Sequence, residues 1–340
     1  MTMKKRPKMK DVAEAAGVSL STVDRILNRR GTVSAATVAH VLRAAERIGY
    51  HGVPTILGRL TEGAPEAKFG FILNSRSREF YAELAHNLQI RCDGSTQLDI
   101  THEIIHLDKP DDRETAEALR ALSRTCSAIA IVAIDGPATR QAIAEANMPV
   151  FALLSPLRCP EIAGFIGANG EKMGRGTGWL MRQLCRKQGV VAILLGSIDY
   201  DIHRAYDVGL RDYLAESETL TVLPYMETRE SDQIAYEIVS KLLATEPDLA
   251  GLAVLGGGLR GAADALANFA GPRVPLVGTE HCDAGDAELR SGRVDAIISH
   301  SIYEIAEKVV RQMEEATLYP EARLLDTLDI RIDIRIAETI

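Results

Sequence analysis

Residues 11–50 decide the fold of the N-terminal part of the chain; they read DVAEAAGVSLSTVDRILNRRGTVSAATVAHVLRAAERIGY. Apolar residues recur there every three or four positions, which is the period of an amphipathic helix. The pattern predicts three short helices, Lys10–Ala16, Leu20–Asn28 and Ala35–Ile48. Gly17 breaks the first helix, and Ser19 and Ser34 stand where N-caps are needed. Helix, short turn, helix and supporting helix are typical of a helix-turn-helix, although any three-helix bundle shows the same periodicity.

The second predicted helix has an outward face suited to DNA. It begins with small polar residues that can approach backbone phosphate, and its outward side chains are Ser21, Thr22, Asp24 and Arg25. Arg25 can form a bidentate pair with guanine O6 and N7, which is worth about 1–3 kcal/mol of discrimination, and Leu20 can contact a thymine methyl group. A carboxylate is disfavoured near phosphate, so Asp24 either accepts from a cytosine N4 or orients Arg25, and we favour the second.

The same run closely resembles the DNA-binding head of the lactose/galactose-repressor family of bacterial transcription regulators. The shared signature is D-V-A-x-x-A-G-V-S-x-x-T-V-x-R-x-L-N, followed by V-S and then I-G-Y. The resemblance implies that Leu20, Ser21 and Arg25 read bases in the major groove. It also implies phosphate contacts at Thr22, Asn28, Thr32 and Ser34. With the N-cap Ser19 and the linker residue Leu60, the candidate DNA-binding residues are Ser19, Leu20, Ser21, Thr22, Arg25, Asn28, Thr32, Ser34 and Leu60.

Residues 51–67, HGVPTILGRLTEGAPEA, have no helical or strand period and are rich in Gly, Pro and Thr. They predict a linker between two domains. In the resembling family this stretch folds into a hinge helix on operator binding and places a leucine in the minor groove. Leu60 stands near that position, but the spacing is shifted and Gly58 replaces alanine, which weakens a helix by about 1 kcal/mol. An ordinary flexible linker is the alternative.

Charge is divided unevenly along the chain. Residues 1–60 hold eleven Lys and Arg against four Asp and Glu, whereas the remaining residues hold 28 against 43. A small basic head on an acidic body is typical of a polyanion-binding module joined to a soluble domain. The acidic body would repel phosphate, so the head alone must supply the affinity for duplex DNA. A basic tail without function is the alternative.

From Lys68 onward, short runs of β-branched residues alternate with helical stretches. The predicted strands are Lys68–Leu73, Ile100–Leu107, Ala128–Ile134, Val150–Leu154, Ile162–Gly167, Val190–Leu195, Thr221–Tyr225, Leu252–Leu255, Leu276–Gly278 and Ala296–Ser299. Helical segments such as Glu171–Lys187 separate many of them, and repeated βα units predict parallel sheets with helices on both faces. So many strands suit two lobes better than one sheet. The final run, Leu328–Ile336, alternates apolar and charged residues and predicts one half-exposed strand.

We therefore predict an α/β chain with a helix-turn-helix head over residues 1–50, a linker over 51–67, and a two-lobed, doubly wound core over 68–340. Coupled to this head, the core resembles that of the same family, which is similar to periplasmic sugar-binding proteins with a ligand between two lobes. Ligand contacts are expected at the carboxyl ends of strands. The candidates are Asn74, Phe80, Tyr81, Asp135, Ser155, Asn169, Asp199, His203, Arg204, Gly257, Glu280 and His300. Most are hydrogen-bonding groups, which suits a hydroxylated ligand, but Asx residues after strands often serve only as helix caps.

Two departures from the resembling family leave the class of ligand open. The family often shows R-x-x-G-F in the helix after the sixth strand, and its arginine binds the ligand. Tyr206 stands at that place here, with His203 and Arg204 displaced upstream. The usual acidic or amide residues near the last two cleft strands are here Glu280 and His300. A sugar, a polyol and a sugar acid all remain candidates.

An NAD(P)-binding oxidoreductase is the alternative function. The sequence GGGLRG at residues 256–261 matches G-x-G-x-x-G, follows a predicted strand and opens a helix, and Glu280 lies about 20 residues further on. Against this function, the motif opens a late βα unit, whereas the fingerprint normally belongs to the first strand of the unit. A free periplasmic binder is a further alternative, which the basic helical head disfavours.

Composition and motifs exclude several other classes. The chain is 46% hydrophobic and 25% charged, which excludes a disordered chain. The sequence contains no stretch of 18 uncharged apolar residues, so it predicts no membrane span. The N-terminal run MTMKKRPKMK lacks the apolar segment of a secretory signal. Five scattered cysteines without C-x-x-C predict reduced thiols in a cytoplasmic protein. His102 and His106 lie four apart on a strand, and we expect no metal, no cofactor and no enzymatic activity.

The sequence thus predicts a ligand-responsive DNA-binding transcriptional regulator that acts as a repressor. Its expected partners are pseudo-palindromic double-stranded operator DNA, a small-molecule effector in the cleft and a second copy of the chain in a homodimer. A corepressor in place of an inducer is left open. No leucine heptad follows the core, so we expect no tetramer-forming tail.

Overall fold

The computed structural model describes residues 7–28, 33, 35–48, 50, 63–108, 111–279, 283–321 and 327–340. These residues fall into two compact units, residues 1–69 with 88–103 and residues 70–87 with 104–340.

The head consists of three short helices, α1 (Met9–Ala15), α2 (Leu20–Asn28) and α3 (Ala35–Arg47). Their apolar faces meet in one small core that contains Val12, Val23 and Val41, all fully buried. Two α3 side chains bind the carbonyl groups at the end of α1: His40 Nε2 lies 2.8 Å from the Ala16 oxygen, and Arg47 donates to the Ala15 oxygen at 2.9 Å. These bonds satisfy carbonyls that a helix end leaves unpaired, so the third helix fixes the first as well as covering it.

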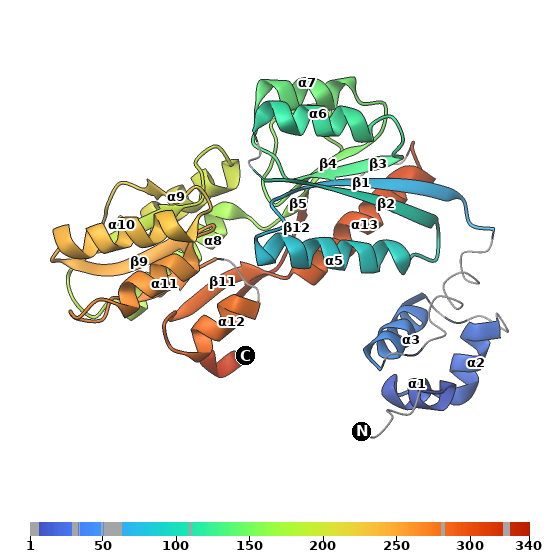
Figure 1. Cartoon of the computed structure of the whole chain (residues 1–340), viewed down its shortest axis with the longest axis horizontal. Helices are drawn as coiled ribbons and strands as arrows, with labels where there is room; N and C mark the ends of the chain where they lie inside the picture. The colour runs from blue at the N-terminus through green and yellow to red at the C-terminus, as the bar shows by residue number, and fades with distance from the viewer. Residues whose placement is uncertain are drawn as a thin grey trace. The chain divides into compact units, whose positions relative to one another are not determined.

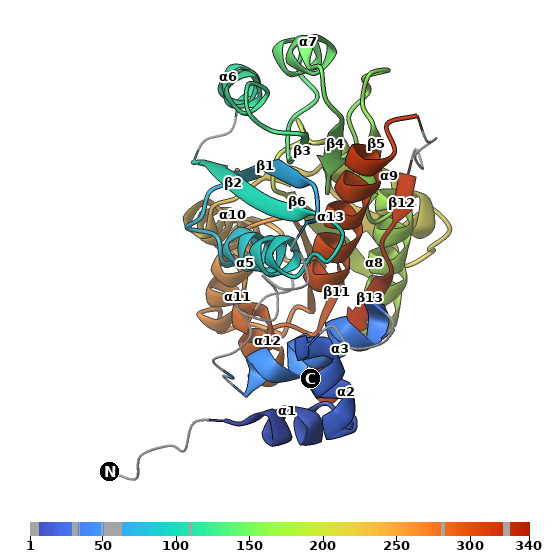
Figure 2. The same ribbon diagram turned by 90° about the vertical axis from the view of Figure 1, so that its right-hand side faces the viewer.

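The first lobe of the core is built on one six-stranded sheet. Its strands are β1 (Glu66–Asn74), β2 (Asp99–Leu107), β3 (Ala128–Ile131), β4 (Val150–Leu153), β5 (Gly164–Gly167) and β12 (Thr327–Asp329). They are arranged in the order β12-β5-β4-β3-β1-β2. One face of the sheet is covered by α6 (Asp112–Leu122) and α7 (Pro137–Glu145), and the other by α5 (Glu79–Asp93) and α13 (Ile302–Leu318) (Figures 1 and 2).

The second lobe is built on a seven-stranded sheet. Its strands are β6 (Gly189–Leu195), β7 (Leu220–Val222), β8 (Met226–Glu227), β9 (Leu249–Leu255), β10 (Leu276–Gly278), β11 (Ala296–His300) and β13 (Ile332–Arg335). The order is β13-β11-β10-β9-β6-β7, with β8 also paired to β6. All of these pairs are parallel except that of β13 with β11. The helices are α8 (Gly170–Leu184), α9 (Asp201–Leu214), α10 (Asp232–Thr245), α11 (Leu259–Ala267) and α12 (Asp283–Arg290), and a 3₁₀ helix spans Ala337–Thr339.

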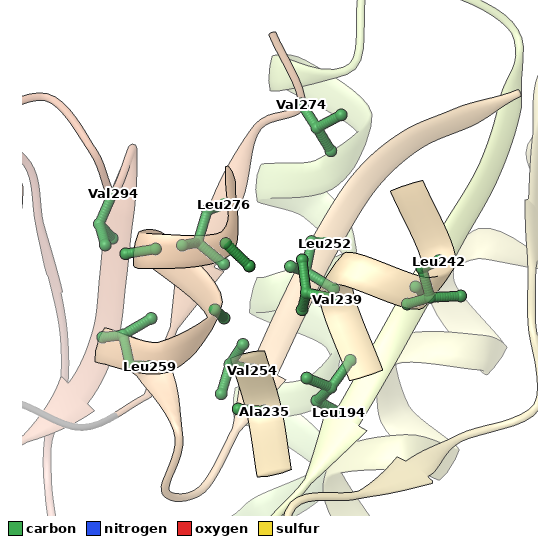
Figure 3. Close-up of a cluster of buried hydrophobic side chains, with 14 of the residues drawn as sticks. Leu194, Ala235, Val239, Leu242, Leu252, Val254, Leu259, Val274, Leu276 and Val294 are labelled. Carbon is green, nitrogen blue, oxygen red and sulfur yellow. The ribbon is translucent and has the colours of Figure 1, made fainter. Parts of the chain in front are cut away.

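The core of the second lobe lies between its sheet and helices α10 and α11 (Figure 3). Leu194, Leu252 and Val254 project from the strands, and Val239 and Leu259 project from the helices toward them. β9 is buried along its whole length. Burial on both faces is expected for a central parallel strand with helices on both sides, and it explains the continuous apolar run of its sequence.

Parallel order brings the carboxyl ends of the strands to one edge of each sheet. The predicted doubly wound, two-lobed α/β fold with an all-α head is therefore confirmed. The chain passes between the lobes at β5–α8, at β11–α13 and at β12–β13.

Two strand predictions are wrong. The run Leu328–Ile336 forms two strands in different sheets: β12 pairs with β5 in the first lobe, and β13 pairs with β11 in the second. The alternation of apolar and charged residues continues through the run, but the strand is interrupted at Ile330 and Arg331; Ile330, only 3% exposed, lies at the passage between the sheets. The strand predicted over Thr221–Tyr225 ends early: only Thr221 and Val222 belong to β7, and β8 begins at Met226, because Pro224 has no N–H to continue the ladder.

Within the part of the chain that the structure describes, every helix is too short or too polar to cross a membrane.

Candidate functional sites

The N-terminus of α2 is organised by the hydroxyl group of Ser19. This oxygen accepts the backbone N–H of Thr22 at 3.1 Å, which is the N-cap bond expected from the sequence. It also lies 2.8 Å from the Ser21 hydroxyl and 2.8 Å from the Thr22 hydroxyl. Three hydroxyl groups are thus gathered at the positive end of a helix, where an anionic oxygen is stabilised.

The outer face of α2 presents Leu20, Ser21 and Arg25. The Leu20 side chain is 49% exposed although it is apolar. The Arg25 guanidinium is placed beside Ser21, since its Nε donates to the Ser21 carbonyl oxygen at 3.3 Å and an amino group lies 3.5 Å from the Ser21 hydroxyl. Asp24 as the group that orients Arg25 stays a prediction. The side chains of Asn28, Thr32, Ser34 and Leu60 lie outside the described residues.

A second site lies between the two lobes of the core, at the carboxyl ends of their strands. Five predicted ligand contacts are brought together around one cavity: Phe80, Tyr81, Ser155, His203 and His300. The cavity is also lined by charged, aromatic and hydroxyl side chains that the prediction did not include: Arg78, Tyr200, Tyr206, Glu230 and Thr279. Both lobes contribute to the lining, so the cavity changes its shape whenever the lobes move.

Asn74 joins the lobes beside this cavity. Its amide nitrogen lies 3.0 Å from the hydroxyl of Tyr81 in the first lobe and 2.9 Å from the hydroxyl of Tyr200 in the second. Burial raises the pKa of Tyr81 to about 12 and also raises the pKa of Tyr200 and of Tyr206. The phenols therefore stay protonated and can donate hydrogen bonds. Asn74 acts on the cavity through Tyr81 and Tyr200.

An ion pair also crosses between the lobes, from Arg78 to Glu230. Glu230 is held within its own lobe, because its carboxylate accepts the N–H of Gly257 at 3.0 Å. Arg229 and Glu230 both have left-handed backbone conformations, with φ of 50° and 63°. Such conformations are costly for residues other than glycine and are concentrated at functional sites.

His203 contributes an uncharged ring to the cavity. Burial lowers its pKa below the ordinary value, which outweighs the opposing effect of the Glu230 carboxylate, 3.8 Å from its Nε2. Its Nδ1 lies 2.7 Å from the Ser197 carbonyl oxygen and 3.1 Å from the Ser197 backbone nitrogen, so the backbone of Ser197 holds the ring in place.

Besides Asn74 and Gly257, four predicted ligand contacts among the described residues lie outside the cavity lining. Asn169 accepts the N–H of Lys172 at 2.9 Å and is the N-cap of α8. Asp135 and Asp199 accept hydrogen bonds from loop neighbours, and Arg204 pairs with Asp201 at 3.2 Å. Glu280 lies outside the described residues. Strand-end position alone does not separate caps and loop contacts from side chains directed at a ligand.

The glycine-rich turn does not support the oxidoreductase alternative. A dinucleotide fingerprint leaves its N–H groups free for a pyrophosphate. Here the N–H of Gly257, itself a predicted ligand contact, donates to the Glu230 carboxylate, and the N–H of Gly261 donates to Asp232 at 3.2 Å. Two carboxylates thus occupy the positions at which phosphate would bind.

The histidines of β2 do not form a metal site with their neighbours. The described residues contain no group of three or more His, Cys, Asp and Glu side chains that fits a metal ion. His106 lies 2.8 Å from the Asn74 carbonyl oxygen, and His102 lies 3.7 Å from Asp93, so the two histidines have separate partners.

The two most consequential residues that sequence reasoning missed are Arg78 and Glu230. They are 152 positions apart, and Glu230 follows a strand of only two residues, so no periodic pattern marks it. The sequence did contain a signal for Tyr206, because this residue stands where the R-x-x-G-F motif of the resembling family has its ligand-binding arginine. Tyr200 could have been found as the ring directly before the helix that carries Tyr206.

Comparison with known proteins identifies both parts. The fold and cleft define the core as a two-lobed binding protein, and residues 69–317 match the model of the periplasmic binding protein domain. Residues 8–52 match the bacterial regulatory proteins of the lacI family. The chain therefore combines a core that belongs to the periplasmic binding protein domain family with a head that matches the lacI family of bacterial regulatory proteins.

Curated relatives match over part of their length. The sucrose operon repressor of Streptococcus mutans is 40% identical over 83 residues, which are 24% of this chain and 25% of that protein. The ribose operon repressor of Escherichia coli is 34% identical over 84 residues, 25% of each chain. These matches span only about a quarter of the length of the relatives.

Solved structures share the fold of the core. A periplasmic solute-binding protein from Actinobacillus succinogenes, with bound D-allose, has a TM-score of 0.73 at 15% identity, over 80% of this chain and 98% of that one. A solute-binding protein from Burkholderia graminis, in complex with D-arabinose, has a TM-score of 0.74 at 15% identity, over 81% and 96%.

Proposed function

We propose that this protein is a transcriptional repressor that binds pseudo-palindromic duplex DNA as a homodimer in the cytoplasm and responds to a small hydroxylated metabolite. The observation that carries the proposal is the combination of the capped α2, with Leu20, Ser21 and Arg25 exposed on its outer face, and a ring-lined cavity between two lobes. The proposed parts are a head over residues 1–50, a linker over 51–67 and a core over 68–340.

On the DNA side, the outer face of α2 enters the major groove. Arg25 reads a guanine, Leu20 contacts a thymine methyl group, and the hydroxyls of Ser19, Ser21 and Thr22 bind phosphate or a base edge. A two-fold dimer presents two such helices to two half-sites, which explains why the site should be pseudo-palindromic.

On the ligand side, closure of the lobes on an effector changes the separation of the two linkers in the dimer. The heads then no longer match the spacing of the half-sites. Coupling of this kind typically amounts to about 1–3 kcal/mol, and it is reciprocal, so operator DNA weakens the effector by the same factor. The names of the sucrose and ribose operon repressors and the sugar-bound structures favour a sugar-like effector.

Selection from a random duplex library tests the DNA side. We expect the intact protein to enrich one pseudo-palindrome, and Arg25→Ala to lose about 1–3 kcal/mol of affinity for it in gel shift. Arg25→Lys keeps the charge and loses the bidentate fork, so it separates base reading from phosphate attraction. Arg182→Ala, at an exposed position of α8, is the control. If no duplex is preferred over random competitor at moderate salt, the proposal is wrong.

A thermal-shift screen of sugars, polyols and sugar acids on the full chain tests the ligand side. A compound that stabilises the protein should also change its affinity for the selected duplex. Stabilisation without any effect on DNA binding would contradict the proposed coupling.

A further inference from the structure

The cavity between the lobes gathers aromatic rings in a chain that has few of them. The whole sequence holds 6 Phe, 9 Tyr and 1 Trp, and four of these rings line the cavity: Phe80, Tyr81, Tyr200 and Tyr206. The phenols are neutral because burial raises their pKa, and the neutral His203 adds a fifth ring. Uncharged ring faces attract organic cations as well as apolar sugar faces, so a second observation must decide between them.

That observation is the position of the Arg78 guanidinium. Its central carbon lies 5.2 Å from the centre of the Tyr81 ring, and the same group is paired with the Glu230 carboxylate. A planar organic cation is therefore already held between a ring and a carboxylate. The Arg78 side chain thus shows that this part of the cavity can hold a planar cation.

Glu230 keeps its place independently of Arg78. Its carboxylate is bound by the Gly257 N–H, and its left-handed backbone is part of a turn in which the Thr228 hydroxyl accepts the Glu230 N–H at 3.2 Å. Arg78 belongs to the other lobe and moves away when the lobes part. The open cleft then exposes a fixed carboxylate in the second lobe.

The surroundings favour a cation over an anion at this carboxylate. Beyond Arg78 and Glu230, the adjoining mouth of the cleft is lined by Glu79, Asp232 and Glu288 against Arg260. Arg293 lies behind, where it pairs with Glu288 at 2.5 Å. An incoming carboxylate would meet this negative field, whereas an ammonium or guanidinium group would be attracted by it.

We propose that Glu230 and the Tyr81 ring form a subsite for a cationic group of the effector, which takes the place of the Arg78 guanidinium when the cleft opens and recloses. The effector is then a sugar or polyol that carries a protonated amine or a guanidinium group. This inference rests on the proposed function only in taking the cleft as the effector site, and it is independent of whether the head binds DNA.

Chemical rescue tests the subsite. In the full-length Arg78→Ala variant, methylguanidinium at millimolar concentration should bind in place of the lost side chain and raise the midpoint of thermal unfolding saturably, by about 2–4 °C. N-methylurea has nearly the same shape without the charge and should have no such effect. Arg78→Ser, which also leaves the guanidinium position vacant, replaces the alanine variant if that one does not fold.

The double variant Arg78→Ala/Glu230→Gln is the matched control, since it keeps the space and removes the carboxylate charge. The proposal is overturned if methylguanidinium fails to stabilise the single variant, or if it stabilises the double variant equally. A second experiment measures the midpoint of thermal unfolding of the wild-type chain with three sugars that share one carbon skeleton. Glucose is neutral, protonated glucosamine is cationic and glucuronate is anionic. A shift with glucosamine that is lost in Glu230→Gln supports the proposal, and a shift with glucuronate alone overturns it. If none of the three shifts the midpoint, the rescue result decides.

Gel shift with the selected duplex separates this inference from the proposed function. Rescue by methylguanidinium together with absence of DNA binding would leave the subsite standing and reject the regulator. DNA binding without rescue by methylguanidinium would support the regulator and reject the subsite.

Discussion

Asn74, the last residue of β1, is hydrogen-bonded at 2.9 Å to the hydroxyl of Tyr200, the residue before α9, although the two are 126 positions apart. The bond joins the two lobes of the core directly. Asn74 is 5% exposed and Tyr200 is 6% exposed, so water is largely excluded from both. The contact between the lobes is therefore maintained by the protein's own polar groups.

We expect Tyr200→Phe to lower the free energy of unfolding by about 1–3 kcal/mol, because a buried amide loses a partner that no water replaces. Urea denaturation of the full chain measures this loss. Tyr225→Phe is the control, since Tyr225 is 39% exposed and its hydroxyl can be replaced by water; it should change stability by less than about 0.5 kcal/mol. Equal effects of the two substitutions would show that the hydrogen bond between Asn74 and Tyr200 does not stabilise the folded protein.

His203 should make stability depend on pH. Burial lowers its pKa in the folded protein, so the unfolded chain takes up the proton first as the pH falls below the ordinary histidine value of about 6.5. The free energy of unfolding should therefore decrease on acidification, by up to about 1.4 kcal/mol for each unit of the pKa difference. Relative to His203→Gln, the wild type should lose stability between about pH 7 and pH 5.

His86→Gln, at an exposed position of α5, is the control for that comparison, because it removes a histidine that does not line the cavity. A wild-type advantage that grows on acidification would mean that the imidazole is stabilised in its charged form, which is the opposite of what burial predicts.

Gly174 should not tolerate a side chain. A Cβ at this position would overlap the backbone carbonyl oxygen of Tyr206, because α8 and α9 approach closely along their glycines. Overpacking of this kind costs about 1–3 kcal/mol, which exceeds the gain of about 1 kcal/mol in helix propensity. We expect Gly174→Ala to lower the urea midpoint. Gly176→Ala on the same helix meets only the flexible end of Ile298 and should cost less; the reverse order would contradict the packing.

Ser19→Ala should destabilise α2 by about 0.5–2 kcal/mol, because the Thr22 N–H loses its cap. Faster amide hydrogen exchange in residues 19–28 measures this effect within the intact chain. Ser19→Asp keeps an accepting oxygen and should preserve protection, while its charge should weaken binding to the selected duplex. Unchanged exchange in the alanine variant would show that the cap bond contributes nothing.

Much of the cleft could be predicted because parallel sheets bring strand ends together. Ser155 and His300 were found on that principle, Phe80 and Tyr81 as rings just beyond the first strand, and His203 from its place near the arginine expected in the family; all five line one cavity. The same principle also selected Asn169, which caps a helix, because an Asx residue after a strand satisfies a backbone N–H as readily as it binds a ligand.

The sequence by itself determined the three-helix head and the α/β class of the core, because helix and strand periods are local and are read within a few residues. Tertiary structure alone decided that Arg78 meets Glu230, that the last run of the chain divides between two sheets, and that a glycine-rich turn is occupied by carboxylates. Each of these depends on which distant segments become neighbours, and no local period encodes that.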